Sequence, residues 1–215
     1  MKQISFAVGL LALVLISACS TPSQKSTAPT DDKPPNNVFY SKPMGFGITK
    51  PSAWHFISDD ILKADRNTLR LDDAQLEKMA RENPNIPLVV FTRHQEPYPT
   101  LNPSVSVTVA FLPVEGVSPR DALHMSTDLS KLAFPDLTVV EPVTDATVAG
   151  IQGAYTQVKY TAAFADGQRF PTQVRMWIVP RGKILFIVGM TGPQEGPDVF
   201  ADILPDILKS IKIDQ

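Results

Sequence analysis

The sequence predicts an α+β domain in which helices cover both faces of a mainly antiparallel β-sheet. Three strongly apolar, strand-like segments follow one another near the C-terminus, and the dipeptide Asp166-Gly167, typical of tight hairpins, joins the first two. Two further segments space their apolar residues as helices do, and one of them follows these strands. Strands that lie before and between helices in this way are typical of α+β folds.

Residues 1–18 resemble a secretory signal peptide in composition. Lys2 supplies one positive charge, residues 4–16 carry none, and Ser17-Ala18 are small. The apolar run is too short to span a bilayer, which needs about 20 apolar residues. Cys19, the single cysteine of the chain, follows immediately. The alternative is an ordinary secreted protein in which this cysteine is a coincidence.

The stretch Ile16-Ser17-Ala18-Cys19 resembles the lipobox of bacterial lipoproteins. The resemblance implies cleavage before Cys19, acylation of its thiol by a chain such as palmitate, and acylation of the new amino terminus. Each buried CH₂ contributes roughly 0.8 kcal/mol, so two or three chains would hold the protein on a membrane durably. Ser20 stands where an aspartate tends to retain Gram-negative lipoproteins in the inner membrane. The resemblance therefore implies the outer membrane, with the domain facing the periplasm.

Residues 19–37 are expected to form the lipidated cysteine and a disordered tether. The segment after Cys19 has no large apolar residue and is rich in Ser, Thr, Pro and Asp, so burial cannot repay its ordering entropy. Residues 38–215 are then predicted to form a single globular domain, because this length supports one substantial core.

Charge and cysteine content argue against several classes of function. Removing residues 1–18 takes away Lys2 and changes the formal charge from −2 to −3, which argues against nucleic acid as a partner. With Cys19 acylated, no thiol remains for a disulfide or a metal–thiolate site. His55, His94 and His124 are not spaced as metal ligands, so neither a metal nor another cofactor is expected.

The first half of the domain is predicted to be rich in short strands. Order should begin near Val38, and strands are expected at 44–50, 54–58, 88–92 and 104–111. The last of these alternates Val with Ser and Thr, a pattern typical of a half-buried strand. Asp72-Asp73 favours a helix over 72–81.

The second half holds the clearest helix. Ser118 as the cap and Pro119 as the first residue predict a helix that ends before Pro135. Its apolar spacing predicts a buried stripe made of Ala122, Met125, Leu129, Leu132 and Ala133.

A strand pair or loop is expected around 137–148, followed by the three strong strands, at 157–164, 174–178 and 184–188. The final helix should begin near Pro197 and continue through a kink at Pro205, because proline removes a backbone hydrogen bond.

The pattern Tyr40…Gly45-Phe46-Gly47-Ile48…Pro51…Trp54 resembles the opening of PsbP-like and DcrB-like domains. The end of the chain is similar too, with an Asp-Gly hairpin, an apolar strand ending near Gly189 and a terminal helix closing in Lys209-Ser210-Ile211. The resemblance covers residues 38–213 in pattern. It implies an α/β/α sandwich that serves as an envelope accessory or photosystem subunit, generally not as an enzyme, and it carries over no functional residue.

The loop from Arg93 to Pro103 is the predicted contact surface. It is long, contains three prolines and joins two predicted strands, and such loops are more often functional than short ones. Arg and Tyr are enriched at binding hot spots, so Arg93, His94 and Tyr98 are the candidate partner contacts. The alternative is that this loop only wraps the edge of the sheet.

Two functions follow as hypotheses. The first is a non-enzymatic, membrane-anchored envelope lipoprotein that binds an envelope protein or an apolar ligand. The second is a hydrolase whose site assembles only in three dimensions, since the sequence has no Gly-x-Ser-x-Gly elbow. A deep cleft that joins His55, His94 or His124 to a carboxylate would favour the hydrolase.

Overall fold

The computed structural model describes residues 37–58, 87–111, 116–164 and 167–214. The predicted signal peptide, Cys19, the predicted helix at 72–81 and all of the predicted tether except Asn37 lie outside these residues. Within the described ranges, no helix has the length and hydropathy that a membrane crossing requires.

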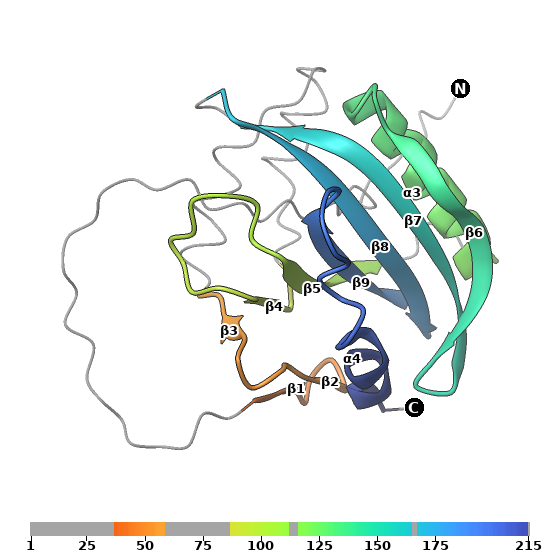
Figure 1. Cartoon of the computed structure of the whole chain (residues 1–215). Coiled ribbons are helices and arrows are strands. Elements are labelled where there is room, and N and C mark those ends of the chain that lie inside the picture. The colour runs from red at the N-terminus through yellow and green to blue at the C-terminus, as the bar shows by residue number, and fades with distance from the viewer. Residues whose placement is uncertain (1–36, 59–86, 112–115, 165–166, 215) are drawn as a thin grey trace.

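Seven of the described strands form the larger sheet, which is antiparallel throughout and has the order β3-β4-β5-β9-β8-β7-β6 (Figure 1). The mainly antiparallel sheet of the α+β prediction is therefore confirmed. Strands β6 to β9 run up and down as neighbours, with Gly182 in the turn between β8 and β9. The bounds are β3 (His55–Phe56), β4 (Val89–Thr92), β5 (Ser104–Phe111), β6 (Thr138–Val148), β7 (Ile151–Ala163), β8 (Arg169–Arg181) and β9 (Ile184–Pro193).

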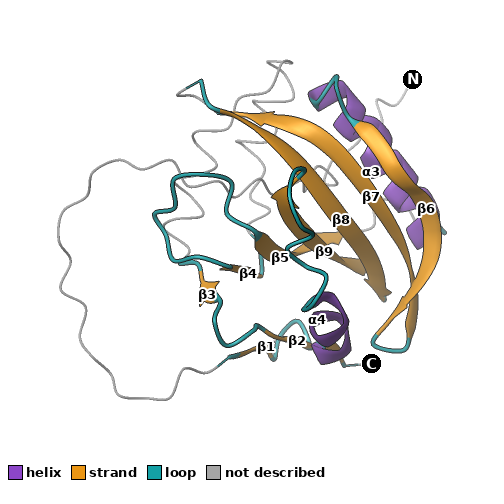
Figure 2. Cartoon of the chain, in the orientation of Figure 1, coloured by secondary structure: helices purple, strands orange, loops and turns teal. Residues whose placement is uncertain are grey.

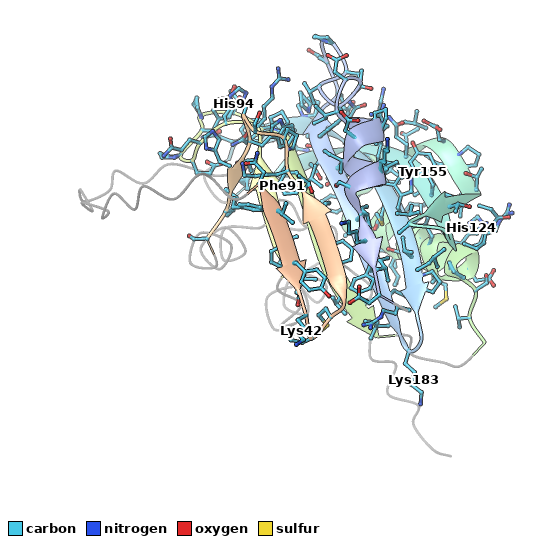
Figure 3. The ribbon with its side chains drawn as sticks, turned by 90° about the horizontal axis from the view of Figure 1, so that it is seen from below. Lys42, Phe91, His94, His124, Tyr155 and Lys183 are labelled. Carbon is cyan, nitrogen blue, oxygen red and sulfur yellow. The ribbon has the colours of Figure 1, made fainter. Side chains whose placement is uncertain are left out.

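Three of the described strands form a smaller sheet, β1 (Val38–Ser41), β2 (Phe46–Thr49) and β10 (Lys212–Ile213). Its order, β1-β2-β10, brings the end of the domain beside its beginning, with Lys212 opposite Gly47. Lys42, in the turn between β1 and β2, lies at one end of the molecule, and His94, which follows β4, lies at the other (Figure 3).

One face of the larger sheet packs against helix α3 (Pro119–Ala133), which contacts β6, β7 and β8 (Figure 2). Ser118 caps this helix by accepting a hydrogen bond from the backbone N–H of Asp121, and Pro119 is its first residue, as the sequence predicts. Leu123 is fully buried among residues that include Leu185 and Ile187 of β9.

The predicted buried stripe of α3 is wrong at two positions. Met125 is 45% exposed and Leu132 is 63% exposed, while the small residues Ser126, Thr127 and Ser130 are buried. Two of these hydroxyl groups donate to carbonyls of their own helix, Thr127 to Leu123 and Ser130 to Ser126, both at 2.8 Å. Because these hydroxyl groups find hydrogen-bond partners within the helix, the small residues can be buried against the sheet. Larger side chains at the same positions would hold α3 farther from the sheet.

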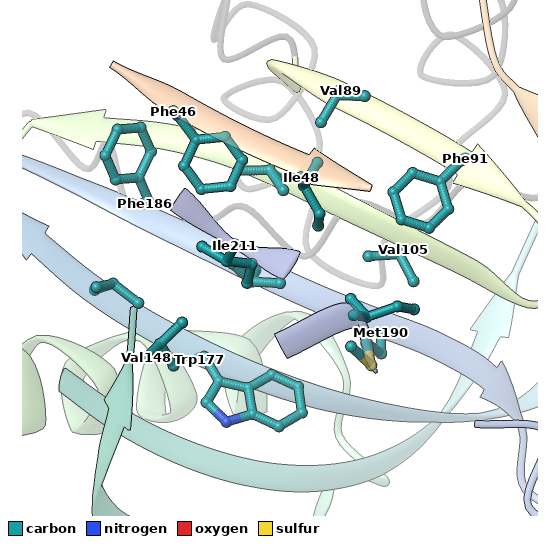
Figure 4. Close-up of a cluster of buried hydrophobic side chains, with 14 of the residues drawn as sticks. Phe46, Ile48, Val89, Phe91, Val105, Val148, Trp177, Phe186, Met190 and Ile211 are labelled. Carbon is teal, nitrogen blue, oxygen red and sulfur yellow. The ribbon is translucent and has the colours of Figure 1, made fainter. Parts of the chain in front are cut away.

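The other face of the larger sheet holds the largest buried cluster (Figure 4). Along β9, Phe186 and Val188 alternate with Leu185 and Ile187, so their side chains point to the face opposite α3. Phe46 of β2 packs on Phe186 with ring centroids 4.8 Å apart, and Trp54 and Ile207 belong to the same cluster. All residues of the three buried clusters lie between 39 and 213, so the described core contains no residue of the predicted tether.

The second helix, α4 (Leu204–Ser210), is shorter than the sequence predicts. It begins at Leu204, so Pro205 lies in its first turn and no helix continues back to Pro197. Proline is tolerated at this position because the first N–H groups of a helix have no partner within it. Since the smaller sheet shares the second face with this short helix, the prediction that helices cover both faces is not confirmed.

Candidate functional site

A pocket of about 320 Å³ lies at the end of the larger sheet where β4, β5, β8 and β9 begin or end. The pairing explains why these segments meet, because Ser104 lies opposite Thr191 and Thr172 lies opposite Pro193. Its walls are mostly proline, aromatic and aliphatic side chains. The lining residues are Arg93, His94, Tyr98, Thr100, Leu101, Pro103, Phe170, Pro171, Pro193, Glu195 and Val199.

The loop of residues 93–103, which joins β4 to β5, forms one wall of this pocket. Asn102, near the C-terminal end of this loop, has a side chain that is completely buried. The side-chain carbonyl of Asn102 accepts a hydrogen bond from the backbone N–H of His94 at 3.1 Å. Its side-chain amide group donates to the backbone carbonyl of His94 at 2.9 Å and to the carboxylate of Glu96 at 2.7 Å. One buried side chain therefore ties three groups of the loop together.

Further hydrogen bonds fix the shape of the loop. Glu96 also accepts from the backbone N–H of Tyr98 at 2.8 Å, and the Thr92 hydroxyl donates to the carbonyl of His94 at 2.8 Å. The backbone N–H of Arg93 donates to the carbonyl of Pro103 at 2.8 Å and so joins the first and last residues of the loop. The loop is thus ordered before any partner arrives, which lowers the entropy cost of binding.

His94 and Tyr98 form a flat aromatic surface on this wall. Their rings are stacked with centroids 4.3 Å apart and planes 7° apart. The Arg93 side chain is exposed beside them, and Glu195 contributes a carboxylate from the opposite side of the pocket. The pocket therefore combines apolar and aromatic walls with one cation and one anion, a composition common in binding sites.

The opposite wall is the segment of residues 194–199, which is fastened to the sheet. Arg175 of β8 donates two hydrogen bonds to the carboxylate of Asp198, at 2.7 and 3.2 Å. The hydrogen bonds from Arg175 hold the pKa of Asp198 below its ordinary value, against the opposing effect of burial. Gln194 donates to the carbonyls of Tyr160 and Thr172 at 2.9 and 3.1 Å. Both walls are therefore held by side-chain hydrogen bonds.

The structure brings the three predicted contact residues, Arg93, His94 and Tyr98, to one pocket. Cys19, the predicted lipidation site, lies outside the described residues. His55 on β3 and His124 on α3 are exposed and do not line this pocket. Across the described ranges, no group of three or more His, Cys, Asp or Glu side chains is placed to hold a metal ion.

Sequence reasoning missed Asn102 and the second wall of the pocket. Asn102 precedes a proline, so it reads as an ordinary turn residue, and its burial depends on a fold that the sequence does not display. Glu195 and Val199 reach the pocket because β5 pairs with β9, a contact between segments distant in the chain. Pro171 and Pro193, which flank the predicted strands at 174–178 and 184–188, were the available signal that these strands approach their ends there, because proline cannot donate to a sheet.

The sequence matches no protein-family profile and no curated protein sequence. Among solved structures, LpqN, involved in cell envelope biogenesis of Mycobacterium tuberculosis, is 12% identical with a TM-score of 0.50, and the match covers 87% of this chain and 90% of LpqN. The cyanobacterial PsbP (CyanoP) of Synechocystis is 10% identical with a TM-score of 0.49, and the match covers 87% of this chain and 98% of CyanoP.

A Bacteroides thetaiotaomicron protein is 13% identical with a TM-score of 0.43, and the match covers 84% of this chain. The present chain spans only 49% of that protein's length. At such low identity, the likeness to LpqN concerns the fold alone.

Proposed function

We propose that this protein is a non-enzymatic accessory protein of the bacterial envelope, held on a membrane by lipid at Cys19, which binds a partner protein through the pocket beside residues 93–103. The observation that carries the proposal is a pre-ordered apolar pocket whose two walls are fixed by hydrogen bonds. The lipobox-like sequence at residues 16–19 supports the anchor, and the fold shared with LpqN, a protein of envelope biogenesis, supports the setting.

The size of the pocket favours a protein segment over a larger apolar ligand. Ligand sites usually enclose about 300–1,000 Å³, and this pocket, at about 320 Å³, lies at the low end. Such a volume accommodates one or two side chains of a partner. Tyr98 and Phe170 offer ring surface for an apolar or aromatic side chain, and Arg93 and Glu195 offer charged contacts around it.

A double substitution, Arg93→Ala with Tyr98→Ala, tests the contact surface. Arg93 is exposed and Tyr98 is half-buried, so we expect the free energy of unfolding to fall by less than about 1 kcal/mol. Chemical crosslinks to the partner in native membranes should be lost. A matched control is Lys131→Ala with His124→Ala on α3, which should keep the crosslinks. Crosslinks that persist in the pocket variant would contradict the proposal.

The anchor is tested separately by cell fractionation of Cys19→Ala. Because the thioether forms on this thiol, the variant should lose the mature, lipidated form and its stable hold on the membrane. Labelling with a palmitate analogue gives the second measurement. A variant that still incorporates the analogue would show that the lipid is elsewhere.

The alternative hydrolase has one observation in its favour, since His94 and Glu195 line the same pocket. Against it, the His94 ring lies flat on Tyr98, and among the described lining residues the hydroxyl groups belong to Thr100 and Tyr98. A general base needs a nucleophile or a water within hydrogen-bond reach. Ester and amide substrates tested with wild type and His94→Ala separate the two functions, because a binding protein should show no turnover that depends on His94.

A further inference from the structure

The prolines in the lining of the pocket argue against one common way of binding a partner segment. In strand addition, a partner strand pairs with the backbone N–H and carbonyl groups of a sheet edge. Pro103, Pro171 and Pro193 line the pocket and have no N–H to donate. The Pro171 carbonyl already accepts from the backbone N–H of Gln194 at 3.0 Å, and the Pro103 carbonyl is used within the loop. A partner strand therefore finds few backbone groups to pair with at these three prolines.

The size of the pocket argues against a second common way, in which an amphipathic helix lies in a groove. Such a helix is about 10 Å across and places side chains from more than one turn against its partner. The pocket, at about 320 Å³, receives only one or two side chains. A third common way is the docking of proline rings from a polyproline II segment against aromatic side chains, which needs no strand edge and no long groove.

The pocket supplies the ring surfaces that this third way requires. The rings of His94 and Tyr98 are stacked with their planes 7° apart, and Phe170 contributes a further ring from β8. All three side chains are half-buried, so part of each remains accessible. A proline ring is apolar and loses no rotamer freedom when it is buried. It therefore packs against these rings at a low entropy cost.

The polar groups of the lining match a segment that is rich in carbonyl groups. The Arg93 guanidinium has only donors, and the hydroxyl groups of Tyr98 and Thr100 can also donate. A polyproline II segment has no internal hydrogen bonds, and each of its prolines offers a carbonyl without an N–H. Donors of the pocket can therefore meet acceptors of the segment, and the prolines bring no N–H that would be buried without a partner.

The charges of the pocket can set the direction of a bound segment. Glu195 is exposed on one wall and Arg93 is exposed on the other. A basic residue next to the prolines would pair with Glu195 and would be repelled by Arg93. Complementary charges of this kind fix orientation more than they raise affinity.

We propose that the pocket binds a proline-rich segment of a partner protein in the polyproline II conformation, with a proline against Tyr98 and Phe170 and a basic residue beside Glu195. The inference rests on the proposed function, binding of a partner through this pocket, and adds the chemistry that the pocket selects. The loop is ordered by its own hydrogen bonds, and a polyproline II segment is largely preformed, so little conformational entropy is lost when they meet.

The test uses residues 20–215, which lack only the predicted signal peptide and Cys19, and short labelled peptides with capped ends. The first peptide repeats Pro-Pro-Ala and ends in lysine. In the second, alanine replaces every proline, and in the third, glutamate replaces the lysine. The fourth is the alanine peptide with one tryptophan. Fluorescence anisotropy should show that the first peptide binds at least about tenfold more tightly than the second and about threefold more tightly than the third.

Two substitutions at Tyr98 separate the ring from its hydroxyl group. Tyr98→Ala should weaken binding of the first peptide by about tenfold, whereas Tyr98→Phe, which keeps the ring, should weaken it by less than about threefold. The matched control is Tyr40→Ala, because Tyr40 is 52% exposed and lies outside the pocket. It should leave binding unchanged. Glu195→Lys should reverse the charge preference, so that the glutamate peptide binds more tightly than the lysine peptide.

The proposal would be overturned if the first peptide did not bind, if the proline and alanine peptides bound equally, or if the tryptophan peptide bound more tightly. An equal loss of binding in Tyr40→Ala and Tyr98→Ala would overturn it as well. The crosslinks in native membranes do not depend on the sequence of the partner. If those crosslinks require Arg93 and Tyr98 while no proline peptide binds, the proposed function stands and the preference for proline is wrong.

Discussion

The two ends of the larger sheet are stabilised by different kinds of side-chain hydrogen bonds. At the pocket end, a long loop joins β4 to β5 and is fastened by Asn102, a polar side chain that is entirely buried. At the other end, tight turns close the strands, and Arg181 fastens them with a half-exposed guanidinium bound to backbone carbonyls. Both ends are therefore fixed, but only the pocket end depends on polar contacts that water cannot replace.

This difference suits the pocket end to recognition by shape. A buried polar clamp gives a loop one shape, because each of its groups would be left unsatisfied in any other arrangement. Recognition by shape in the pocket needs that precision. The following three measurements probe this contrast, from the largest expected effect to the smallest.

Asn102→Ala should produce the largest loss. It leaves the N–H and carbonyl of His94 and the carboxylate of Glu96 without their buried partner, so we expect a loss of about 2–4 kcal/mol in the free energy of unfolding. Urea unfolding measures this loss. A loss below about 1 kcal/mol would show that the loop does not depend on its buried amide.

Arg181→Ala should cost less, about 1 kcal/mol, although it also removes two short hydrogen bonds. Water can reach the freed carbonyls of Met44 and Asp214 at this half-exposed site, so their desolvation penalty is small. The same urea titration applies. If this variant is as unstable as Asn102→Ala, the distinction between the buried hydrogen bonds of Asn102 and the solvent-accessible ones of Arg181 is wrong.

Asp198→Asn should have the smallest effect, and one that depends on pH. Arg175 lowers the pKa of Asp198 in the folded protein, so its contribution is present above the unfolded pKa of about 3.9 and is lost as pH falls through the folded value. Solvent screening limits it to less than about 1 kcal/mol, because a third of the Asp198 side chain is exposed. The stability difference from wild type should therefore be constant near neutral pH and narrow below about pH 4. A difference that widens in acid would contradict the assignment.

Much of the architecture could be predicted because it depends on local patterns. The strand at 104–111, the Ser118-Pro119 start of α3 and the loop after β4 were all predicted from neighbouring residues, and the structure has each of them. The prediction that β5 is half-buried is wrong, because Ser104, Ser106 and Thr108 are buried as well as two of its three valines. The loop also led to Arg93, His94 and Tyr98, because prolines interrupt the strand pattern there.

The errors arose where packing or distant pairing decides. Apolar spacing alone favoured Met125 and Leu132 as buried, whereas the sheet receives the small residues of α3. Pro205 appeared to interrupt a long helix and instead lies in the first turn of a short one. Asn102 and Glu195 acquire their roles from the pairing of β5 with β9, which no local pattern reports.

The central claim, binding through the pocket, is tested most directly by site-specific photo-crosslinking in cells that make the full chain with Cys19 intact. A photoreactive side chain replaces Thr100, which is exposed and lines the pocket, and in a second strain it replaces His124, which is exposed on α3. We predict an adduct of defined mass at position 100 that disappears when Arg93→Ala and Tyr98→Ala are added, and none at position 124. The same adducts at both positions, or none at position 100, would contradict the account.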